Sequence, residues 1–260
     1  MSVQSQAGRQ LERVIGSRAK RRVVRALDPW VAALYRGDAV ECPCCGRTFR
    51  AFRNFQGNAQ CPYCGVLERH RLLWLYLTRD TNLLASGTEV LHMAPERGVE
   101  RALKHQPGLR HVSADLSPER ADVVADLTGL PFADESFDWA LCSHVLEHVP
   151  DDVAAMSELC RVLRRGGTAI VMYPVEYGRA KTYEDSRITS PEERERAFGQ
   201  HDHVRIYGAD HIDRLVSAGF EVHVEKYGAR LDQRRAERYG LVAPQGRNTT
   251  DEIYVCRRPE

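Results

Sequence analysis

The chain has 260 residues, of which 43% are hydrophobic and 28% charged, and its formal net charge at pH 7 is +1. This length holds one α/β domain and a smaller appendage, while the near-neutral balance excludes a whole-protein field that would favour nucleic acid or anionic membranes. No apolar run approaches the roughly 20 residues that span a bilayer, and no apolar core with a cleavage site begins the chain. We therefore expect neither a membrane partner nor a secretory signal.

Residues 1–37 place apolar side chains at three- and four-residue intervals, which predicts amphipathic helices. The pattern is interrupted at Asp28-Pro29, where aspartate can cap and proline can start a second helix, and Gly37 is the predicted end. The first helix is basic between Arg9 and Arg25. The basic side of this helix could bind phosphate on a substrate or RNA. Alternatively, it could be a solvated face whose arginine stems cover apolar surface.

Two Cys-Pro-x-Cys-Gly units lie fifteen residues apart and indicate a metal site. Structural zinc takes four soft ligands in a tetrahedron, and a tight turn with two cysteines three apart supplies two of them. Paired units of this kind also favour a reducing, cytoplasmic setting over disulfides. The predicted ligands of a structural Zn²⁺ are Cys42, Cys45, Cys61 and Cys64, although a register that uses Cys44 stays open.

Residues 38–80 are expected to form a zinc ribbon and a helix that docks it onto the next domain. Between the cysteine pairs, Arg47 to Phe55 interleaves three arginines with three phenylalanines. Such side chains can stack on bases, but they equally form the small core and rim of a ribbon, which we prefer. Residues 67–77 then predict a helix with a strongly apolar second half.

Residues 81–260 carry the pattern of a second, larger domain. Short apolar runs at 123–125 and 137–142, bounded by polar residues, indicate buried strands of a parallel sheet. Ligands bind beyond the carboxyl ends of such strands, where Asp126, Ser143 and His144 would lie. Further strands are predicted at 89–94, 111–115, 168–172, 220–224 and 252–256, with helices at 99–105, 152–163 and 210–218.

A long polar segment, residues 173–208, interrupts this domain and is a candidate for a substrate-selecting loop or lid. His201-Asp202-His203 is weak evidence for a metal site, and a general base beside an oxygen or nitrogen nucleophile is the better hypothesis. A purely structural role for these histidines stays open, as do packing and capping roles for His144 and His148. The candidate catalytic residues are His148, His201 and His203.

The block from Asp122 to Asp152, with its Leu-Pro-Phe-x-Asp-x-Ser-Phe-Asp segment, resembles the middle of the class I S-adenosylmethionine-dependent methyltransferases. Together with the cysteine units, the Leu-His-Met-Ala-Pro-Glu segment and the Thr-Tyr-Glu-Asp…His-Asp-His-Val-Arg region, it is similar to a zinc-ribbon-bearing group of that family. The resemblance implies a Rossmann-like sheet of seven strands, the last antiparallel, with N-terminal helices and a small zinc ribbon. It also implies S-adenosylmethionine as cofactor.

In the register of this family, Ala94, Glu96 and Gly98 occupy the three glycine positions of the cofactor loop, and only Gly98 is glycine. Glu96 would then contact the methionine amino group of the cofactor. An acidic residue after the second strand accepts the ribose hydroxyls in Rossmann-like sites, which points to Asp115. The implied cofactor-binding residues are Ala94, Glu96, Gly98, Asp115, Leu116, Asp126 (at the adenine), Leu127 (through its amide), Ser143 and His144.

The resemblance implies methyl transfer to an oxygen or nitrogen nucleophile, and we expect a polar small molecule as acceptor: a sugar, a nucleotide-linked metabolite or a natural-product intermediate. RNA methylation is an alternative, since a ribosomal RNA guanine methyltransferase family also joins a zinc ribbon to this fold. The near-neutral charge and the absence of an Asn/Asp-Pro-Pro-Tyr motif argue against it. A second alternative is a non-catalytic zinc-ribbon binding module on a degenerate scaffold. The sequence does not give the oligomeric state.

Overall fold

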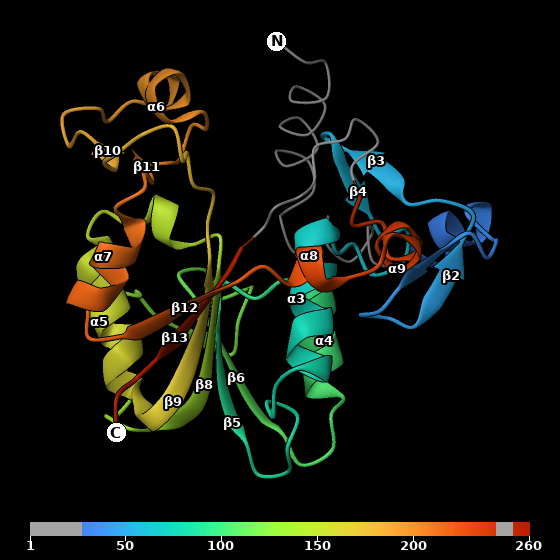
Figure 1. Ribbon diagram of the computed structural model, residues 1–260, viewed down its shortest axis with the longest axis horizontal. Helices are drawn as coiled ribbons and strands as arrows, with labels where there is room; N and C mark the ends of the chain where they lie inside the picture. The colour runs from blue at the N-terminus through green and yellow to red at the C-terminus, as the bar shows by residue number, and fades with distance from the viewer. Residues whose placement is uncertain (1–27, 243–251) are drawn as a thin grey trace.

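A seven-stranded mixed sheet forms the centre of the larger domain (Figure 1). The structure, a computed structural model, describes residues 28–242 and 252–260. Strand β13 is antiparallel to both of its neighbours, so the predicted Rossmann-like sheet with an antiparallel last strand is confirmed. The spatial order is β12 (Glu221–Glu225), β13 (Ile253–Arg257), β9 (Leu163–Met172), β8 (Phe137–Ser143), β5 (Glu89–Met93), β6 (Arg110–Asp115) and β7 (Val123–Val124).

The strand order reverses at β5, which pairs in parallel with β6 on one side and with β8 on the other. The chain runs outward from β5 through β6 to β7, returns to β8 and continues to β9. Because crossovers leave in opposite directions at this point, a crevice opens beyond the carboxyl ends of β5 and β8. The fold therefore puts its ligand site at the ends of these two strands.

Helices cover both faces of the sheet (Figure 1). Neighbouring strand residues point to opposite faces, so Val90 belongs to the apolar core that includes α3, and Leu91 to the core that includes α5. None of the helices within 28–242 and 252–260 is long and apolar enough to cross a membrane. Apart from the helices at 28–34 and Pro191–Phe198, which are described below, the α-helices of the described residues are α3 (Glu68–Arg79), α4 (Arg97–Lys104), α5 (Asp152–Val162), α7 (His211–Ser217), α8 (Tyr227–Arg230) and α9 (Gln233–Arg238).

The cysteine-rich segment folds as two antiparallel hairpins, β1 (Val40–Cys42) with β2 (Arg47–Phe49) and β3 (Arg53–Phe55) with β4 (Asn58–Gln60). Phe49 is buried and Phe52 lies under the guanidinium of Arg71 at 3.8 Å, whereas Phe55 is exposed. Two of the three phenylalanines therefore build the interior, as we preferred. The buried cysteines of the ribbon belong to the same core as the leucines of α3.

Arg71 joins the ribbon, α3 and the end of α9. Its side chain is fully buried and donates to four backbone carbonyls, those of Ala59 (2.8 Å), Val66 (3.2 Å), Tyr239 (2.7 Å) and Gly240 (2.9 Å). Gly240 adopts a positive φ of 60°, and a Cβ there would lie 2.4 Å from the Phe52 ring. The Arg71 guanidinium thus ties together segments about 170 residues apart in the chain.

The segment 173–208 contains β10 (Tyr183–Glu184), α6 (Pro191–Phe198) and β11 (Arg205–Ile206), and Figure 1 places it at the end of the molecule toward which β5 and β8 run. Helix α6 was not predicted. Ser190 and Glu193 form a capping box, Pro191 opens the helix and Gly199 closes it with a φ of 82°. This Ser-Pro-x-Glu signature is visible in the sequence and could have revealed the helix.

Near the amino end, residues 28–34 are helical, so this helix ends before Gly37, the predicted end. The helix expected before Asp28, with its basic side, lies outside the described residues.

Candidate active site

A cavity of about 520 Å³ opens at the carboxyl ends of β5, β6, β7 and β8. This volume is in the range of sites for small molecules. Six of the nine residues predicted to bind the cofactor line it: Ala94, Asp115, Leu116, Asp126, Leu127 and His144. The wall is completed by Met93, Ala114, Arg120, Ala125, Val145, His148, Val149 and Pro150, and by Arg194 and Asp202 of the 173–208 segment.

Two carboxylates stand at consecutive strand ends along the cavity. Oδ1 of Asp115 accepts a hydrogen bond from the Ser117 amide at 2.7 Å. Oδ1 of Asp126 accepts from the amide of Thr128 at 2.9 Å and from its hydroxyl at 2.8 Å, and these bonds lower the pKa of Asp126. Because the local bonds end on Oδ1, the second oxygen of each carboxylate can accept from a ligand.

Two of the four non-glycine residues with a positive φ in the described part of the chain lie at the ends of the neighbouring strands β5 and β8. Ala94, directly after β5, has a φ of 43°, and His144, directly after β8, has a φ of 54°. Non-glycine residues rarely adopt this left-handed region, which costs on the order of 1–3 kcal/mol and is found preferentially at functional sites. Ala94 thus keeps the conformation of a glycine loop without the glycine.

Glu96, Gly98 and Ser143 are not among the residues that line the cavity. A Cβ on Gly98 would lie 2.3 Å from Cγ1 of Val66 and 3.2 Å from the Cys64 carbonyl oxygen, so this glycine lets α4 pack against the ribbon. Ser143 is buried, and its Oγ has no hydrogen-bond partner in the described part of the chain. The contacts of these three residues with a cofactor stay predictions.

The Glu96 carboxylate is held between two histidines, with Oε2 at 2.9 Å from Nε2 of His92 and Oε1 at 3.5 Å from Nε2 of His70. Nδ1 of His70 accepts from the Leu67 amide at 3.1 Å, so Nε2 carries the ring proton. Oε1 of Glu96 has no hydrogen-bond partner within the described residues. Burial lowers the pKa of His70 to about 4. Burial acts to raise the pKa of Glu96, but the two histidines outweigh it and hold that pKa at about 2.

The structure brings two of the three candidate catalytic histidines together. The rings of His148 and His203 pack edge to face with centroids 4.7 Å apart, and burial lowers the pKa of His203. The side chain of His201 is 67% exposed and is not part of this pair, although its Nδ1 lies 4.0 Å from Oδ1 of Asp202. Glu147 also reaches the pair, but the sequence analysis missed it. Its one sequence signal is a charge inside an otherwise apolar turn, between Leu146 and Val149.

A buried ionic cluster anchors the 173–208 segment next to the cavity. Oδ2 of Asp152 accepts from the Tyr207 hydroxyl at 2.7 Å and from Nε of Arg214 at 2.9 Å, and Arg205 lies 3.6 Å from Oδ1. Burial acts to raise the pKa of Asp152, but the Arg214 hydrogen bond and the Arg205 charge outweigh it and lower that pKa. Arg205 also donates to the carbonyls of Leu146 (2.7 Å) and Pro150 (2.8 Å).

We expect Asp152→Asn to lower the free energy of unfolding at pH 7 by about 3 kcal/mol, because it removes the buried counter-charge of Arg205 and Arg214. It leaves these two arginines the exposed carboxylate of Glu184, at 3.0 and 3.2 Å. Since the folded pKa of Asp152 lies below its ordinary value of 3.8, its contribution is complete above that value and is lost as the pH falls through the folded pKa. Urea unfolding at pH 7, 5 and 3 should therefore give a difference between the two proteins that shrinks in acid. Asp134→Asn, at a 71% exposed side chain, is the control. A pH-independent difference would contradict this assignment.

The cysteine cluster has the dimensions of a tetrahedral metal site. The Sγ atoms of Cys42 and Cys64 are 3.6 Å apart, those of Cys45 and Cys61 are 3.8 Å apart, and all four lie within 4.8 Å of one another. A tetrahedron with Zn–S bonds of about 2.3 Å has edges of about 3.8 Å. Sγ of Cys44 instead lies 3.8 Å from the His70 carbonyl oxygen, which places Cys44 outside the cluster.

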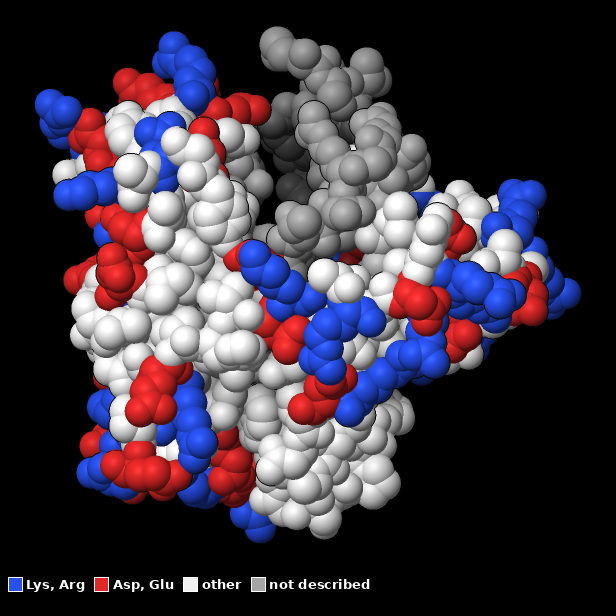
Figure 2. Space-filling view, in the orientation of Figure 1, with Lys and Arg blue, Asp and Glu red and all other residues white. Residues whose placement is uncertain are grey.

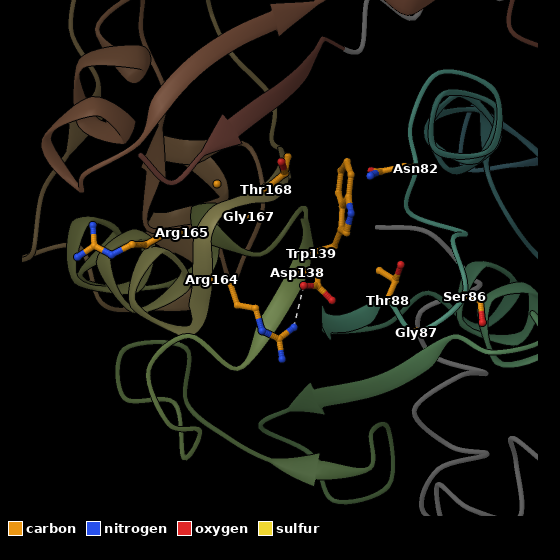
Figure 3. Close-up of a pocket in the computed structure, with 11 residues that line it drawn as sticks. Asn82, Ser86, Gly87, Thr88, Asp138, Trp139, Arg164, Arg165, Gly167 and Thr168 are labelled. Atoms are coloured by element: carbon orange, nitrogen blue, oxygen red, sulfur yellow. Dashed lines mark hydrogen bonds and ion pairs between the residues drawn. The ribbon is translucent and has the colours of Figure 1, made fainter. Parts of the chain in front are cut away.

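A second cavity, of about 450 Å³, lies at the opposite edge of the sheet, near the start of β5 (Figure 3). Its charged groups are already paired: Arg164 donates to Oδ1 of Asp138 at 2.7 Å, and Oδ2 of Asp138 accepts from the Glu89 amide at 2.8 Å. Asn82 and Thr88 both lie on one side of the Trp139 ring in the same pocket (Figure 3). None of the predicted site residues lines this cavity.

Comparisons with known proteins agree with the geometry. Residues 87–171 match the family described as a methyltransferase domain. A demethylmenaquinone methyltransferase of Beutenbergia cavernae is 37% identical over 110 residues, which are 38% of this chain and 46% of that protein. One of Mycobacterium marinum is 31% identical over 151 residues, 54% of this chain and 65% of that protein. The matched region thus spans about half the length of these curated relatives.

Two solved structures share the fold. An S-adenosylmethionine-dependent methyltransferase from Mesorhizobium loti is 18% identical with a TM-score of 0.52, covering 72% of this chain and 98% of that one. The cyclase SpnF is 18% identical with a TM-score of 0.50, covering 93% and 96%. The fold is that of the class I S-adenosylmethionine-dependent methyltransferases. The chain carries a methyltransferase domain at residues 87–171. A fold alone does not define a reaction.

Proposed function

We propose that this protein is an S-adenosylmethionine-dependent methyltransferase that binds its cofactor in the 520 Å³ cavity. The observation that carries the proposal is the pair Asp115 and Asp126, which line one cavity at consecutive strand ends beside the switch point of the sheet. Asp115 accepts the two ribose hydroxyls, and Asp126 accepts the adenine amino group near the Leu127 amide. The methionine end then lies toward Ala94 and His144.

Bound S-adenosylmethionine supplies an activated methyl group on a sulfonium. The protein mainly has to align the acceptor with the S–CH₃ bond and exclude water. His148 and Asp202 line the far part of the cavity, where the acceptor would sit, and His148 is the best-placed group to take up a proton. Arg194 of helix α6 also lines the cavity.

The acceptor is proposed to be a polar small molecule with an oxygen or nitrogen nucleophile. The names of the relatives from Beutenbergia cavernae and Mycobacterium marinum specify a small-molecule acceptor, demethylmenaquinone. Acidic and basic side chains lie interspersed on the face in Figure 2, including the ribbon, and no extended basic surface favours RNA there.

We further propose that the four-cysteine cluster holds a structural Zn²⁺, supported by sulfur–sulfur distances of 3.6 and 3.8 Å. The cluster is closed, with no position left for a substrate, which suits a structural ion. None of the eight cysteines, all of which are in the described residues, forms a disulfide. Free thiols beside a zinc ribbon suit a reducing, cytoplasmic setting.

Calorimetry with S-adenosylmethionine tests the cofactor site. The zinc-loaded protein should bind with a dissociation constant on the order of micromolar, and Asp115→Ala should weaken binding about 100-fold, because two charge-assisted hydrogen bonds at about 1.5 kcal/mol or more each are lost. Asp134→Ala, at a 71% exposed carboxylate outside the cavity, should bind like the parent.

Failure of the zinc-loaded protein to bind S-adenosylmethionine would favour the non-catalytic binding module. If RNA copurified with the protein and its affinity fell steeply with rising salt, RNA would instead be the favoured methyl acceptor.

A further inference from the structure

Three potential metal ligands converge beside the cavity: Glu147, His148 and His203. Each offers one ligand atom, and the three atoms lie within 4.8 Å of one another. Glu147 and His148 belong to the short 3₁₀ turn after β8 (Leu146–His148), and His203 comes from the 173–208 segment. His148 also lines the cavity, so the cluster borders the space proposed for the acceptor.

The Glu147 carboxylate has an unsatisfied oxygen. The residue is 1% exposed. Oε1 lies 3.2 Å from Nδ1 of His144, whereas Oε2 has no hydrogen-bond partner among the described residues. An unpaired buried carboxylate oxygen is costly, since it has lost its water without gaining a donor. A cation bound between Glu147 and the two imidazoles would remove this cost.

The ring of His148 is oriented as that of a metal ligand is. Nδ1 of His148 lies 3.3 Å from the carbonyl oxygen of Asp202. Because a carbonyl only accepts, this nitrogen donates, and the other ring nitrogen keeps a lone pair. A second ring nitrogen bonded to a backbone carbonyl is the usual way in which a ligating histidine is fixed.

The backbone holds the two segments in register. The Val204 amide donates to the Glu147 carbonyl at 2.9 Å, and Arg205 donates to the Leu146 carbonyl at 2.7 Å. His203 is therefore fastened to the turn that carries the other two ligands, so an ion would find the donors already assembled.

We propose that Glu147, His148 and His203 bind a divalent metal ion that faces the cavity with open coordination positions. Three protein ligands of the two-histidine, one-carboxylate type leave such positions, and imidazole and carboxylate donors suit Zn²⁺, Mn²⁺ or Fe²⁺. This inference rests on the proposed function and narrows it, because the open positions would take an oxygen of the acceptor. The acceptor is then a hydroxyl compound. A compound with a second oxygen next to that hydroxyl would bind better, because the second oxygen could fill another open coordination position on the ion.

Methyl transfer to the bound hydroxyl needs no reactant besides the acceptor and S-adenosylmethionine. With one ring nitrogen donating to the Asp202 carbonyl and the other on the ion, His148 orients the metal instead of taking up the proton. Coordination lowers the pKa of the acceptor hydroxyl, which releases its proton to solvent. The oxygen lone pair then forms the bond to the methyl carbon, while the C–S bond breaks and leaves its electron pair on sulfur. The products are a methyl ether and S-adenosylhomocysteine.

To test the site, Mn²⁺ is titrated into protein that carries one Zn²⁺ per chain, so that zinc fills the thiolate site alone. Binding is followed by the loss of the free-ion signal in electron paramagnetic resonance. Mn²⁺ prefers oxygen and imidazole donors and leaves the thiolate site to zinc. One Mn²⁺ should bind per chain. His203→Gln and Glu147→Gln should each weaken binding at least about 100-fold, since loss of even an outer-shell partner costs about 10–100-fold. His201→Gln changes an exposed side chain two residues from His203 and should leave Mn²⁺ affinity unchanged.

No stoichiometric Mn²⁺ binding by the parent protein, or parent-like binding by folded His203→Gln, would overturn the proposal. Should Glu147→Gln fail to fold, the more accessible His203→Gln decides. Calorimetry with S-adenosylmethionine on the same samples separates the two proposals. Cofactor binding without Mn²⁺ binding overturns the metal site alone, whereas Mn²⁺ binding without cofactor binding supports the site and overturns the proposed function.

Discussion

Cys61→Ser is expected to abolish zinc binding and to unfold the ribbon. Cys61 is 1% exposed, and its Sγ lies 3.8 Å from that of Cys45 in the four-sulfur cluster. The binding energy of a structural zinc, about 10–16 kcal/mol in zinc-finger peptides at pH 7, is energy of folding in such small units. Removal of one thiolate should therefore cost several times the roughly 1 kcal/mol of an average substitution.

The matched control is Cys44→Ser, which changes a cysteine in the same knuckle whose Sγ lies outside the cluster. Metal analysis should give one zinc per chain for the parent and Cys44→Ser, and none for Cys61→Ser, whose melting temperature should also fall. Loss of zinc from Cys44→Ser would mean that the knuckle uses the other register.

The damage should extend beyond the ribbon. Gly98 in the first turn of α4 allows contact with Val66 and Cys64 of the ribbon. Helix α4 begins directly after the Ala94 loop of the cavity. We therefore expect chelation of zinc to weaken S-adenosylmethionine binding and to lower stability, although no residue of the cavity is substituted.

The sequence is informative about the cavity because strand ends in a parallel sheet follow from local pattern. Asp115 and Asp126 each come directly after or close to a short apolar run, and the carboxyl ends of such runs meet at one edge. The cysteine spacing is equally local. Both features need only a few neighbouring residues to be recognised, and the structure places Asp115 and Asp126 on one cavity wall and the four sulfurs together.

The features that could not be predicted from the sequence depend on contacts between distant segments. Gly98 fits a cofactor-loop register in the sequence, and its packing against the ribbon, more than thirty residues earlier, is a second role that the local pattern does not give. Glu147 and His203 lie more than fifty residues apart, and they are brought together by bonds between the two segments, such as those from the Val204 amide to the Glu147 carbonyl and from Arg205 to the Leu146 carbonyl. No periodicity or spacing encodes such a meeting, because it depends on how the 173–208 segment folds back over the sheet.

The buried guanidinium of Arg71 is the last such contact, and Arg71→Met should be strongly destabilising. Burial lowers the pKa of Arg71, while the charges of Cys42 and Glu68 act to raise it, so the cation sits close to the sulfur cluster. Methionine would leave the carbonyls of Ala59, Val66, Tyr239 and Gly240 without this donor. Loss of one member of a buried charged network typically costs about 3–5 kcal/mol.

Arg71→Lys should recover only part of that loss, because an ammonium has three donors and lacks the planar fork that reaches four separate carbonyls. Arg79→Met is the matched control: Arg79 lies on the same helix and donates to the Tyr239 hydroxyl at 2.8 Å, but from an exposed position. Its substitution should change the free energy of unfolding by about 0.5 kcal/mol or less. Urea unfolding of the zinc-loaded proteins measures all three, and an Arg71→Met variant as stable as Arg79→Met would mean that the ribbon, α3 and α9 are held together by apolar packing alone.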